Sequence, residues 1–113
     1  MRVDELMRPR TQFLSFRPPV SLSDLGGRVP PSGYLLITEP DSEEVAQAIP
    51  LRSLAAVPTE HLERYADEVA YVPWCTSVAD ALQTMRERGL HVAAVINEFG
   101  ETTGILTFDD ILD

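Results

Sequence analysis

The chain has 113 residues, 44% of them hydrophobic and 24% charged, and it carries a formal net charge of −9. Its length fits one domain, or two very small units that share a core. All its basic residues are arginines, which excludes a Schiff-base lysine and a Walker-type phosphate loop, and the acidic balance argues against a nucleic-acid or anionic-membrane surface.

The first half of the chain predicts short elements that proline and glycine interrupt. Residues 1–7 fit one helical turn, which Arg8-Pro9-Arg10 ends because proline restricts the residue before it. The elements that follow, in order, are a β run at 13–16, a short helix at 21–25, a strand at 33–38, a second strand at 45–49 and a helical fragment at 51–56.

The second half predicts longer elements. Thr59 is placed to cap a helix that runs through Ala66. After this helix come a strand, the strongest helix of the chain and a β hairpin, each ended by a proline, a glycine or a turn. In order, they are a strand at 69–72, a helix at 77–88 ended by Gly89, and apolar runs at 91–96 and 104–106 on either side of a turn at 97–100.

The two halves repeat each other. Residues of the first half resemble in type the residues 56 positions later. The matched pairs are Phe13 with Val69, Phe16 with Val72, Ser21 with Ser77, Leu22 with Val78, and Asp24 with Asp80. One copy has too little apolar surface to fold alone, so we expect two copies that pack together sheet to sheet.

A polar corner follows the last predicted strand. Thr107 stands at the N-cap position of a final helix, and Asp110 lies three residues further on. Such a switch from strand to helix, with free backbone N–H groups, can hold a small anionic or hydroxylated ligand. It is also the pattern of an ordinary capped helix, and on these residues alone the cap is the favoured interpretation.

The stretch from Gly89 to Leu112 resembles the second motif of a tandem cystathionine-β-synthase (CBS) domain pair. More narrowly, the chain resembles the CBS pair of the CorC/HlyC-type magnesium–cobalt efflux and hemolysin-like membrane proteins. The matching positions are His91, Glu98-Phe99-Gly100, Gly104-Ile105-Leu106-Thr107 and Asp109-Asp110-Ile111-Leu112, and residues 3–11 resemble the segment that leads into the family's first motif.

The resemblance implies an α/β (α+β) fold of two β-α-β-β-α CBS motifs, packed sheet to sheet with pseudo-two-fold symmetry. Residues 1–57 would form a degenerate first motif and residues 69–113 the second, with 58–68 as connector, and together they would make one CBS-pair domain. CBS pairs commonly dimerise into a flat disk through their helices, so the resemblance also implies a homodimer.

The resemblance further implies a site for an adenine nucleotide, namely AMP, ADP or ATP, with or without Mg²⁺. Asp110 matches the residue that accepts hydrogen bonds from the ribose hydroxyls, and Thr107 matches the residue that meets ribose or phosphate. Gly104 would let the backbone come close. The implied adenine-side wall consists of Tyr71, Val72, Pro73 and Ala93. Apart from the resemblance, four arginines could neutralise a phosphate, namely Arg8, Arg10, Arg86 and Arg88. Arginines at a helix end also complement the helix dipole, which is the favoured interpretation for Arg88.

The first motif departs from this pattern. Gln47, Pro50 and Ser53 stand in register with the three site positions of the second motif. The ribose-binding carboxylate is therefore absent there, and Pro50 offers neither a hydroxyl nor an N–H. We expect at most one working nucleotide site, built on Thr107 and Asp110.

Other residues carry weaker signals. His91 at a strand start and Trp74 in a loop are more typical of packing than of ligand contact. Cys75 is the only cysteine, so a disulfide within the chain and a cysteine-based metal site are excluded. An acidic set near the C-terminus could hold Mg²⁺, although a solvated surface is the favoured interpretation; its members are Glu98, Glu101, Asp109, Asp110 and Asp113.

Two hypotheses follow for function. The first is a non-catalytic regulatory domain that binds an adenine nucleotide and controls a CorC-like membrane protein, whose transmembrane part lies outside this chain. The second is a structural or dimerisation module that has lost nucleotide binding, which the degenerate first motif and the negative charge favour. Without a nucleophile–base pair we expect no enzyme. No apolar run approaches the roughly 20 residues that span a bilayer, so we expect a soluble, cytoplasmic domain.

Overall fold

The computed structural model describes residues 1–112 and divides into two compact units. One is made from two stretches of chain, residues 1–12 and the described residues from Val69 onward, and is called here the composite unit. The other, Phe13–Glu68, is called the continuous unit. The division therefore groups the first 12 residues with the second motif, whereas the sequence reading had placed them in the first.

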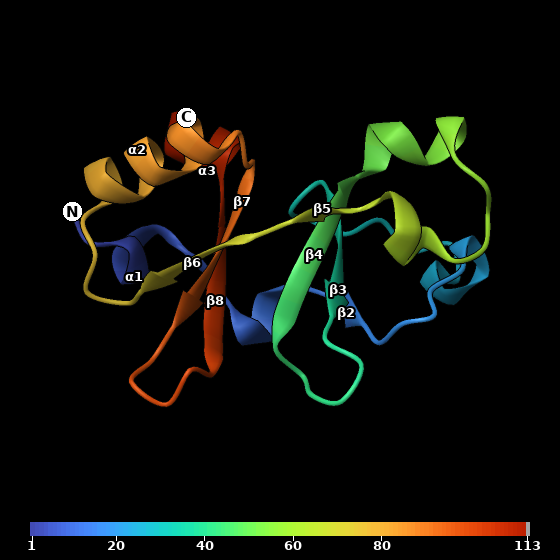
Figure 1. Cartoon of the computed structure of the whole chain (residues 1–113), viewed down its shortest axis with the longest axis horizontal. Helices are drawn as coiled ribbons and strands as arrows, with labels where there is room; N and C mark the ends of the chain where they lie inside the picture. Colours follow the sequence, from blue (N-terminus) through green and yellow to red (C-terminus); the bar gives the residue numbers. More distant parts are fainter. Residues whose placement is uncertain (113) are drawn as a thin grey trace. The chain divides into compact units, whose positions relative to one another are not determined.

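The composite unit is a four-stranded sheet with the strand order β1-β8-β7-β6. β6 and β7 are parallel, and the β7–β8 and β8–β1 pairs are antiparallel. Its helices α1, α2 and α3 lie on one face of this sheet (Figure 1). The bounds are α1 Val3–Leu6, β1 Arg8–Pro9, η1 Arg10–Gln12, β6 Ala70–Pro73, α2 Val78–Arg88, β7 Val92–Ile96, β8 Thr102–Thr107 and α3 Phe108–Leu112.

Helix α2 forms where the sequence predicted the strongest helix. The Ser77 hydroxyl accepts the N–H of Asp80 at 3.1 Å, which caps the first turn, and Gly89 ends the helix in the left-handed conformation with φ of 64°. The buried face of α2 presents Ala81 and Met85 to the sheet. The core between helices and sheet consists of Val3, Ala70, Val72, Ala81, Met85, Leu90, Ala93, Val95 and Leu106.

The continuous unit is also a four-stranded sheet, with the strand order β2-β3-β4-β5. Each helical segment in it is a short 3₁₀ turn, and one core of apolar side chains joins these turns to the sheet. The bounds are β2 Ser15–Phe16, η2 Leu22–Leu25, β3 Tyr34–Thr38, β4 Val45–Pro50, η3 Leu51–Ala56, η4 Leu62–Tyr65 and β5 Asp67–Glu68. The core residues are Val20, Leu25, Leu35, Ile37, Ile49 and Leu62.

The helix predicted from Thr59 through Ala66 is shorter than expected. Only η4 forms, because His61 just before it takes the left-handed conformation with φ of 55°, which a regular helix cannot include. The sequence gives no sign of this left-handed residue, because position 61 is a histidine and not a glycine, the residue type that adopts this conformation readily.

The internal repeat is confirmed by strand register. β3 in one sheet and β7 in the other pair with equivalent partners on both sides. Both hairpins also carry an irregularity at the equivalent place, between Ile37 and Thr38 and between Val95 and Ile96. The equivalent triplets are Ser15–Leu36–Ala48 and Tyr71–Ala94–Ile105. Each unit thus contains the predicted β-α-β-β-α order, with 3₁₀ turns in place of α-helices in the continuous unit.

The fourth strand of each sheet comes from the segment that precedes the other repeat, an arrangement called here the edge-strand exchange. β1 precedes β2 in the chain but pairs with β8, and β5 precedes β6 but pairs with β4. Neighbouring contacts repeat as well. The N–H of Val3 donates to the Thr76 carbonyl at 2.8 Å, and the N–H of Leu62 donates to the Val20 carbonyl at 2.8 Å.

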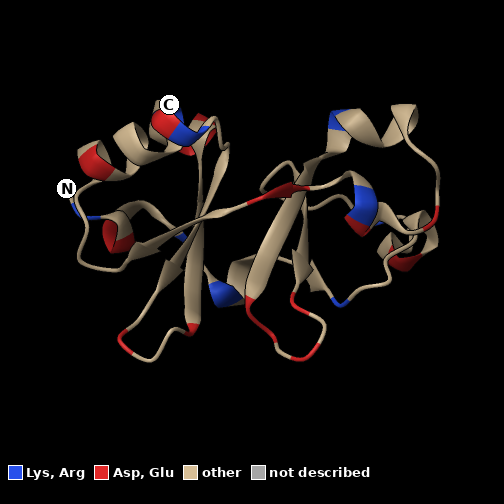
Figure 2. Cartoon of the chain, viewed as in Figure 1, with Lys and Arg blue, Asp and Glu red and all other residues tan. Residues whose placement is uncertain are grey.

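The surface charge follows the hairpins. Acidic residues mark the turns between β3 and β4 and between β7 and β8 (Figure 2). None of the helices in residues 1–112 has both the length and the apolar character needed to cross a membrane.

Candidate functional site

The corner between β8 and α3 has the geometry of a capped helix. Thr107 ends β8 with 1% of its surface exposed, and its hydroxyl accepts the N–H of Asp110 at 3.0 Å. The predicted N-cap is therefore confirmed. The same bond brings the hydroxyl of Thr107 next to the residue that carries the predicted ribose carboxylate.

The carboxylate of Asp110 is held by an arginine from the opposite end of the chain. Arg8 donates from Nε to one carboxylate oxygen and from Nη2 to the other, both at 3.2 Å. The side chain of Arg8 is 32% exposed and that of Asp110 is 20% exposed. Two parallel hydrogen bonds between a guanidinium and a carboxylate fix the orientation of both groups. The sequence reading had named both residues but had not paired them.

Gly104 permits a close approach of the β1 backbone, whereas its predicted role in the nucleotide site stays a prediction. A Cβ placed on Gly104 would lie 2.7 Å from the Arg8 carbonyl oxygen and would overlap the Met7 sulfur. β1 can therefore pair with β8 only because position 104 has no side chain. This pairing sets Arg8 opposite Ile105 and so within reach of Asp110.

The predicted adenine-side wall is divided between the two faces of the sheet. Val72 and Ala93 lie in the core beneath the helices. Because successive side chains of a strand point to opposite faces, Tyr71 and Pro73 share the other face with Thr107. Tyr71 is 45% exposed, and Pro73 is exposed too. A ligand on the face of Thr107 could meet the side chains of Tyr71 and Pro73, but only the main chain of Val72 and Ala93.

His91 and Phe108 form a small packed group beside the corner. The N–H of Phe108 donates to the His91 carbonyl at 2.8 Å, and the two rings meet edge to face with centroids 6.1 Å apart. The Arg86 guanidinium lies 6.0 Å from the Phe108 ring centroid. These contacts give His91 and Arg86 packing roles that do not require a ligand.

Trp74 likewise has protein partners. Its indole N–H donates to Glu98 at 3.2 Å, and the Arg2 guanidinium lies 5.2 Å from its ring centroid. Within residues 1–112, no group of three or more His, Cys, Asp or Glu residues is arranged to hold a metal ion. Asp113, the last of the predicted acidic set, lies outside the described residues.

The equivalent corner of the continuous unit, between β4 and η3, has a different chemistry. Pro50 occupies the cap position with φ of −61° and makes no side-chain cap. Gln47, which stands where Gly104 stands in the composite unit, donates from its amide to the Glu63 carbonyl at 3.0 Å. Ser53 in place of an aspartate leaves this corner without a carboxylate.

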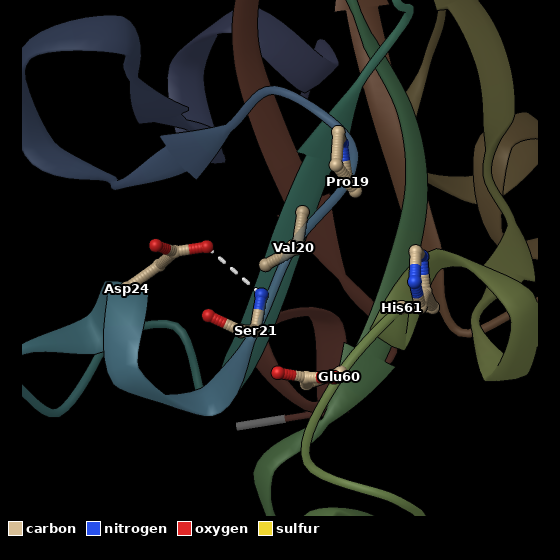
Figure 3. Close-up of a pocket in the computed structure, with 6 residues that line it drawn as sticks. All are labelled: Pro19, Val20, Ser21, Asp24, Glu60 and His61. Atoms are coloured by element: carbon tan, nitrogen blue, oxygen red, sulfur yellow. Dashed lines mark hydrogen bonds between the residues drawn. The ribbon is translucent and has the colours of Figure 1, made fainter.

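A shallow hollow of about 290 Å³ lies elsewhere on the continuous unit (Figure 3). Two of its lining residues are bonded to each other, since the Asp24 carboxylate accepts the N–H of Ser21 at 2.8 Å. No local sequence pattern indicates this hollow, whose lining combines residues 19–24 with residues 60–61. The lining residues are Pro19, Val20, Ser21, Asp24, Glu60 and His61.

The Glu63 carboxylate contacts two residues that line this hollow, Val20 and His61. One of its carboxylate oxygens accepts the N–H of Val20 at 2.9 Å, and the other lies 3.4 Å from Nδ1 of His61. Desolvation alone would raise the pKa of Glu63, but hydrogen bonds from the backbone N–H groups of Val20 and of Glu63 itself, together with His61, lower this pKa below its usual 4.5.

Comparison with known proteins confirms the resemblance that the sequence indicated. Residues 76–113 match the CBS domain family model. A UPF0053 protein of Mycobacterium tuberculosis, MT1890, is 24% identical over 120 residues, which cover all of this chain and 26% of the relative. The UPF0053 inner membrane protein YfjD of Escherichia coli is 24% identical over 126 residues, which cover all of this chain and 28% of that protein. The chain thus spans about a quarter of the length of these curated relatives.

Solved structures show the same fold. The CBS domain of a bacterial CNNM/CorC family Mg²⁺ transporter in complex with ATP is similar with a TM-score of 0.81 and 21% identity, over 99% of this chain and 84% of that one. A CBS-domain pair with bound AMP from Klebsiella pneumoniae is similar with a TM-score of 0.77 and 20% identity, over 99% and 95%. The predicted fold class is therefore confirmed.

Proposed function

We propose that this chain, which has the fold of a CBS-domain pair, is a non-catalytic regulatory domain that binds an adenine nucleotide at the Thr107–Asp110 corner. One observation carries the proposal. The hydroxyl of Thr107 and the residue that carries the carboxylate, Asp110, stand together where β8 turns into α3, and the backbone N–H of Asp110 donates to that hydroxyl at 3.0 Å. A carboxylate is a strong acceptor for two neighbouring ribose hydroxyls. The ATP and AMP in the two similar structures support an adenine nucleotide as the ligand.

The proposal extends to the larger protein. The similarity to YfjD and to the CNNM/CorC domain supports a role as the cytoplasmic, homodimeric control domain of a CorC-like magnesium–cobalt efflux membrane protein. Nucleotide binding would favour one arrangement of the domain over another, and the membrane part would respond to that change. Any Mg²⁺ would accompany the nucleotide phosphates, since the corner offers too few oxygen ligands of its own.

A thermal-shift titration tests the proposal. The 113-residue chain would be titrated with AMP, ADP and ATP, each with and without Mg²⁺. A ligand at 100 times its Kd stabilises the folded state by about 2.7 kcal/mol, so we expect a saturable rise in Tm with at least one nucleotide. Asp110→Ala should remove this rise, and Ser53→Ala at the equivalent position of the other corner should keep it.

A second candidate is the structural or dimerisation module. The bonds between Arg8 and Asp110 favour it, because they satisfy the carboxylate without any ligand. This candidate predicts no change in Tm with any of the three nucleotides. It would be ruled out by a saturable rise that Asp110→Ala abolishes.

A further inference from the structure

The pair formed by Arg8 and Asp110 joins residues 102 positions apart in the sequence. We propose that Arg8 determines the specificity of the corner, so that a phosphorylated nucleotide binds and the corresponding nucleoside does not. This inference rests on the proposed nucleotide function and adds to it the residue that recognises the phosphate group.

The hydrogen-bonding capacity of the Asp110 carboxylate is partly used within the chain. Each of its two oxygens already accepts one N–H from Arg8 at 3.2 Å. A guanidinium is a stronger donor to a carboxylate than a neutral hydroxyl, because both partners are charged. The ribose of an uncharged nucleoside therefore competes with Arg8 and provides nothing to the guanidinium in return.

The Arg8 guanidinium keeps N–H donors that Asp110 does not use. A guanidinium carries five N–H donors, and Asp110 takes one from Nε and one from Nη2. Within residues 1–112, the N–H groups of Nη1 donate to no other atom. The side chain is 32% exposed, so a ligand can reach these donors. A phosphate group matches the planar fork of an arginine and can accept two of its N–H groups at once.

A nucleotide satisfies both members of the pair. Its phosphate accepts hydrogen bonds from Arg8 while its ribose hydroxyls donate to Asp110. With a net charge of −9, the chain as a whole repels anions, so a positive group at the corner favours binding of a phosphate there. Arg8 is held at the corner by the pairing of β1 with β8 and by the absence of a side chain at Gly104.

The test compares AMP with adenosine, which differ only in the phosphate group. Isothermal titration calorimetry would give the Kd of each for the unmodified chain and for Arg8→Gln, Arg8→Lys and Arg64→Gln. Arg64→Gln is the matched control, because it removes the same charge from an exposed arginine of η4. Urea denaturation of each variant would confirm that it is folded.

We expect AMP to bind the unmodified chain on the order of tenfold or more tightly than adenosine, as a charge-assisted pair of hydrogen bonds allows. Arg8→Gln should weaken AMP but leave adenosine as it is or tighten it, which brings the two Kd values within about threefold. Arg64→Gln should keep the original preference. A lysine keeps the charge without the fork, so Arg8→Lys should reduce the preference at least threefold, and this variant carries the test if Arg8→Gln does not fold.

An unchanged preference for AMP in a folded Arg8 variant would overturn the inference and leave the proposed function intact. Equal binding of AMP and adenosine to the unmodified chain would do the same. Absence of binding by AMP, ADP and ATP alike would instead overturn the proposed function, and the inference with it.

Discussion

The two corners where a strand turns into a helical segment, β8–α3 and β4–η3, share one backbone plan and differ in chemistry. Their hairpins pair in the same register and carry an irregularity at the same point. Yet one corner has a hydroxyl cap and a carboxylate held by an arginine, and the other has Pro50 and Ser53. Register depends on the alternation of buried and exposed side chains along a whole strand. Ligand chemistry depends on two or three residues, which can change without altering the register.

The edge strands show a second difference between the corners. Gly104 allows Met7 and Arg8 to lie against β8, whereas Gln47 at the equivalent place reaches out to the Glu63 carbonyl. The composite unit therefore has an arginine at its corner. In the continuous unit, the amide of Gln47 instead forms a hydrogen bond to the segment that contains Glu63. Equivalent positions thus admit an edge strand in one unit and hold a connecting segment in the other.

The largest effect is expected where the edge strand crosses Gly104. Gly104→Val should destabilise the chain by about 3 kcal/mol, because its side chain overlaps Met7 and the Arg8 carbonyl and forces β1 away from β8. Gln47→Val is the matched change in the continuous unit and should cost about 1 kcal/mol, mostly through the lost bond to Glu63. Urea denaturation measures both values. Equal losses at the two positions would show that the edge strands approach both corners alike.

A large effect on binding is expected at Asp110. Calorimetry with the tightest-binding adenine nucleotide should give one site per chain. Asp110→Asn should weaken its affinity on the order of tenfold, because a neutral amide replaces the charged acceptor. Ser53→Ala should leave both affinity and stoichiometry unchanged. Two nucleotides bound per chain would contradict the view that the β4–η3 corner cannot bind.

The cap of α3 should have a moderate effect. Thr107→Val keeps the shape of the side chain but removes the hydroxyl that accepts the Asp110 N–H. We expect a loss of about 1 kcal/mol in the free energy of unfolding, measured by urea denaturation. Thr107→Ser retains the hydroxyl and should recover most of that stability. If Thr107→Ser lost more stability than Thr107→Val, packing of the methyl group would outweigh the cap.

The smallest effect is expected at Glu63 in the continuous unit. Because its pKa is lowered in the folded state, the charged carboxylate stabilises the fold above its unfolded pKa, and this contribution is lost as the pH falls through the folded value. Glu63→Gln should therefore be less stable than the unmodified chain at pH 7, and the difference should shrink at pH values below about 4. Urea denaturation across this pH range measures the difference. A gap that stays constant with pH would contradict the assignment to Glu63.

Much of the fold follows from local sequence signals. The strands, the cap at Ser77, the stop at Gly89 and the cap at Thr107 each depend on residues a few positions apart, and the structure confirms them. The repeat could also be predicted, because equal spacing of similar residues survives in both halves. The left-handed conformation of His61 could not be predicted, because residues other than glycine adopt it only rarely.

The site could be predicted only in part. Thr107 and Asp110 are neighbours in sequence, so their proximity follows from one helical turn. Arg8 reaches Asp110 across 102 residues, and no local pattern indicates a contact of that range. The division of the adenine-side wall was missed for another reason. Val72 and Tyr71 are adjacent, and adjacent residues of a strand face opposite ways.

The edge-strand exchange has a consequence for the order in which the protein assembles during synthesis. All four strands of the continuous unit are available once Glu68 has left the ribosome. β1 precedes every other strand of the described residues, yet its partner residues Gly104 and Ile105 lie in β8, which follows all of them. Contacts of such long range form slowly, because a large loop must close first. The segment that carries Arg8 therefore stays unpaired until β8 has been made, and the β8–α3 corner becomes complete only when β1 pairs with β8.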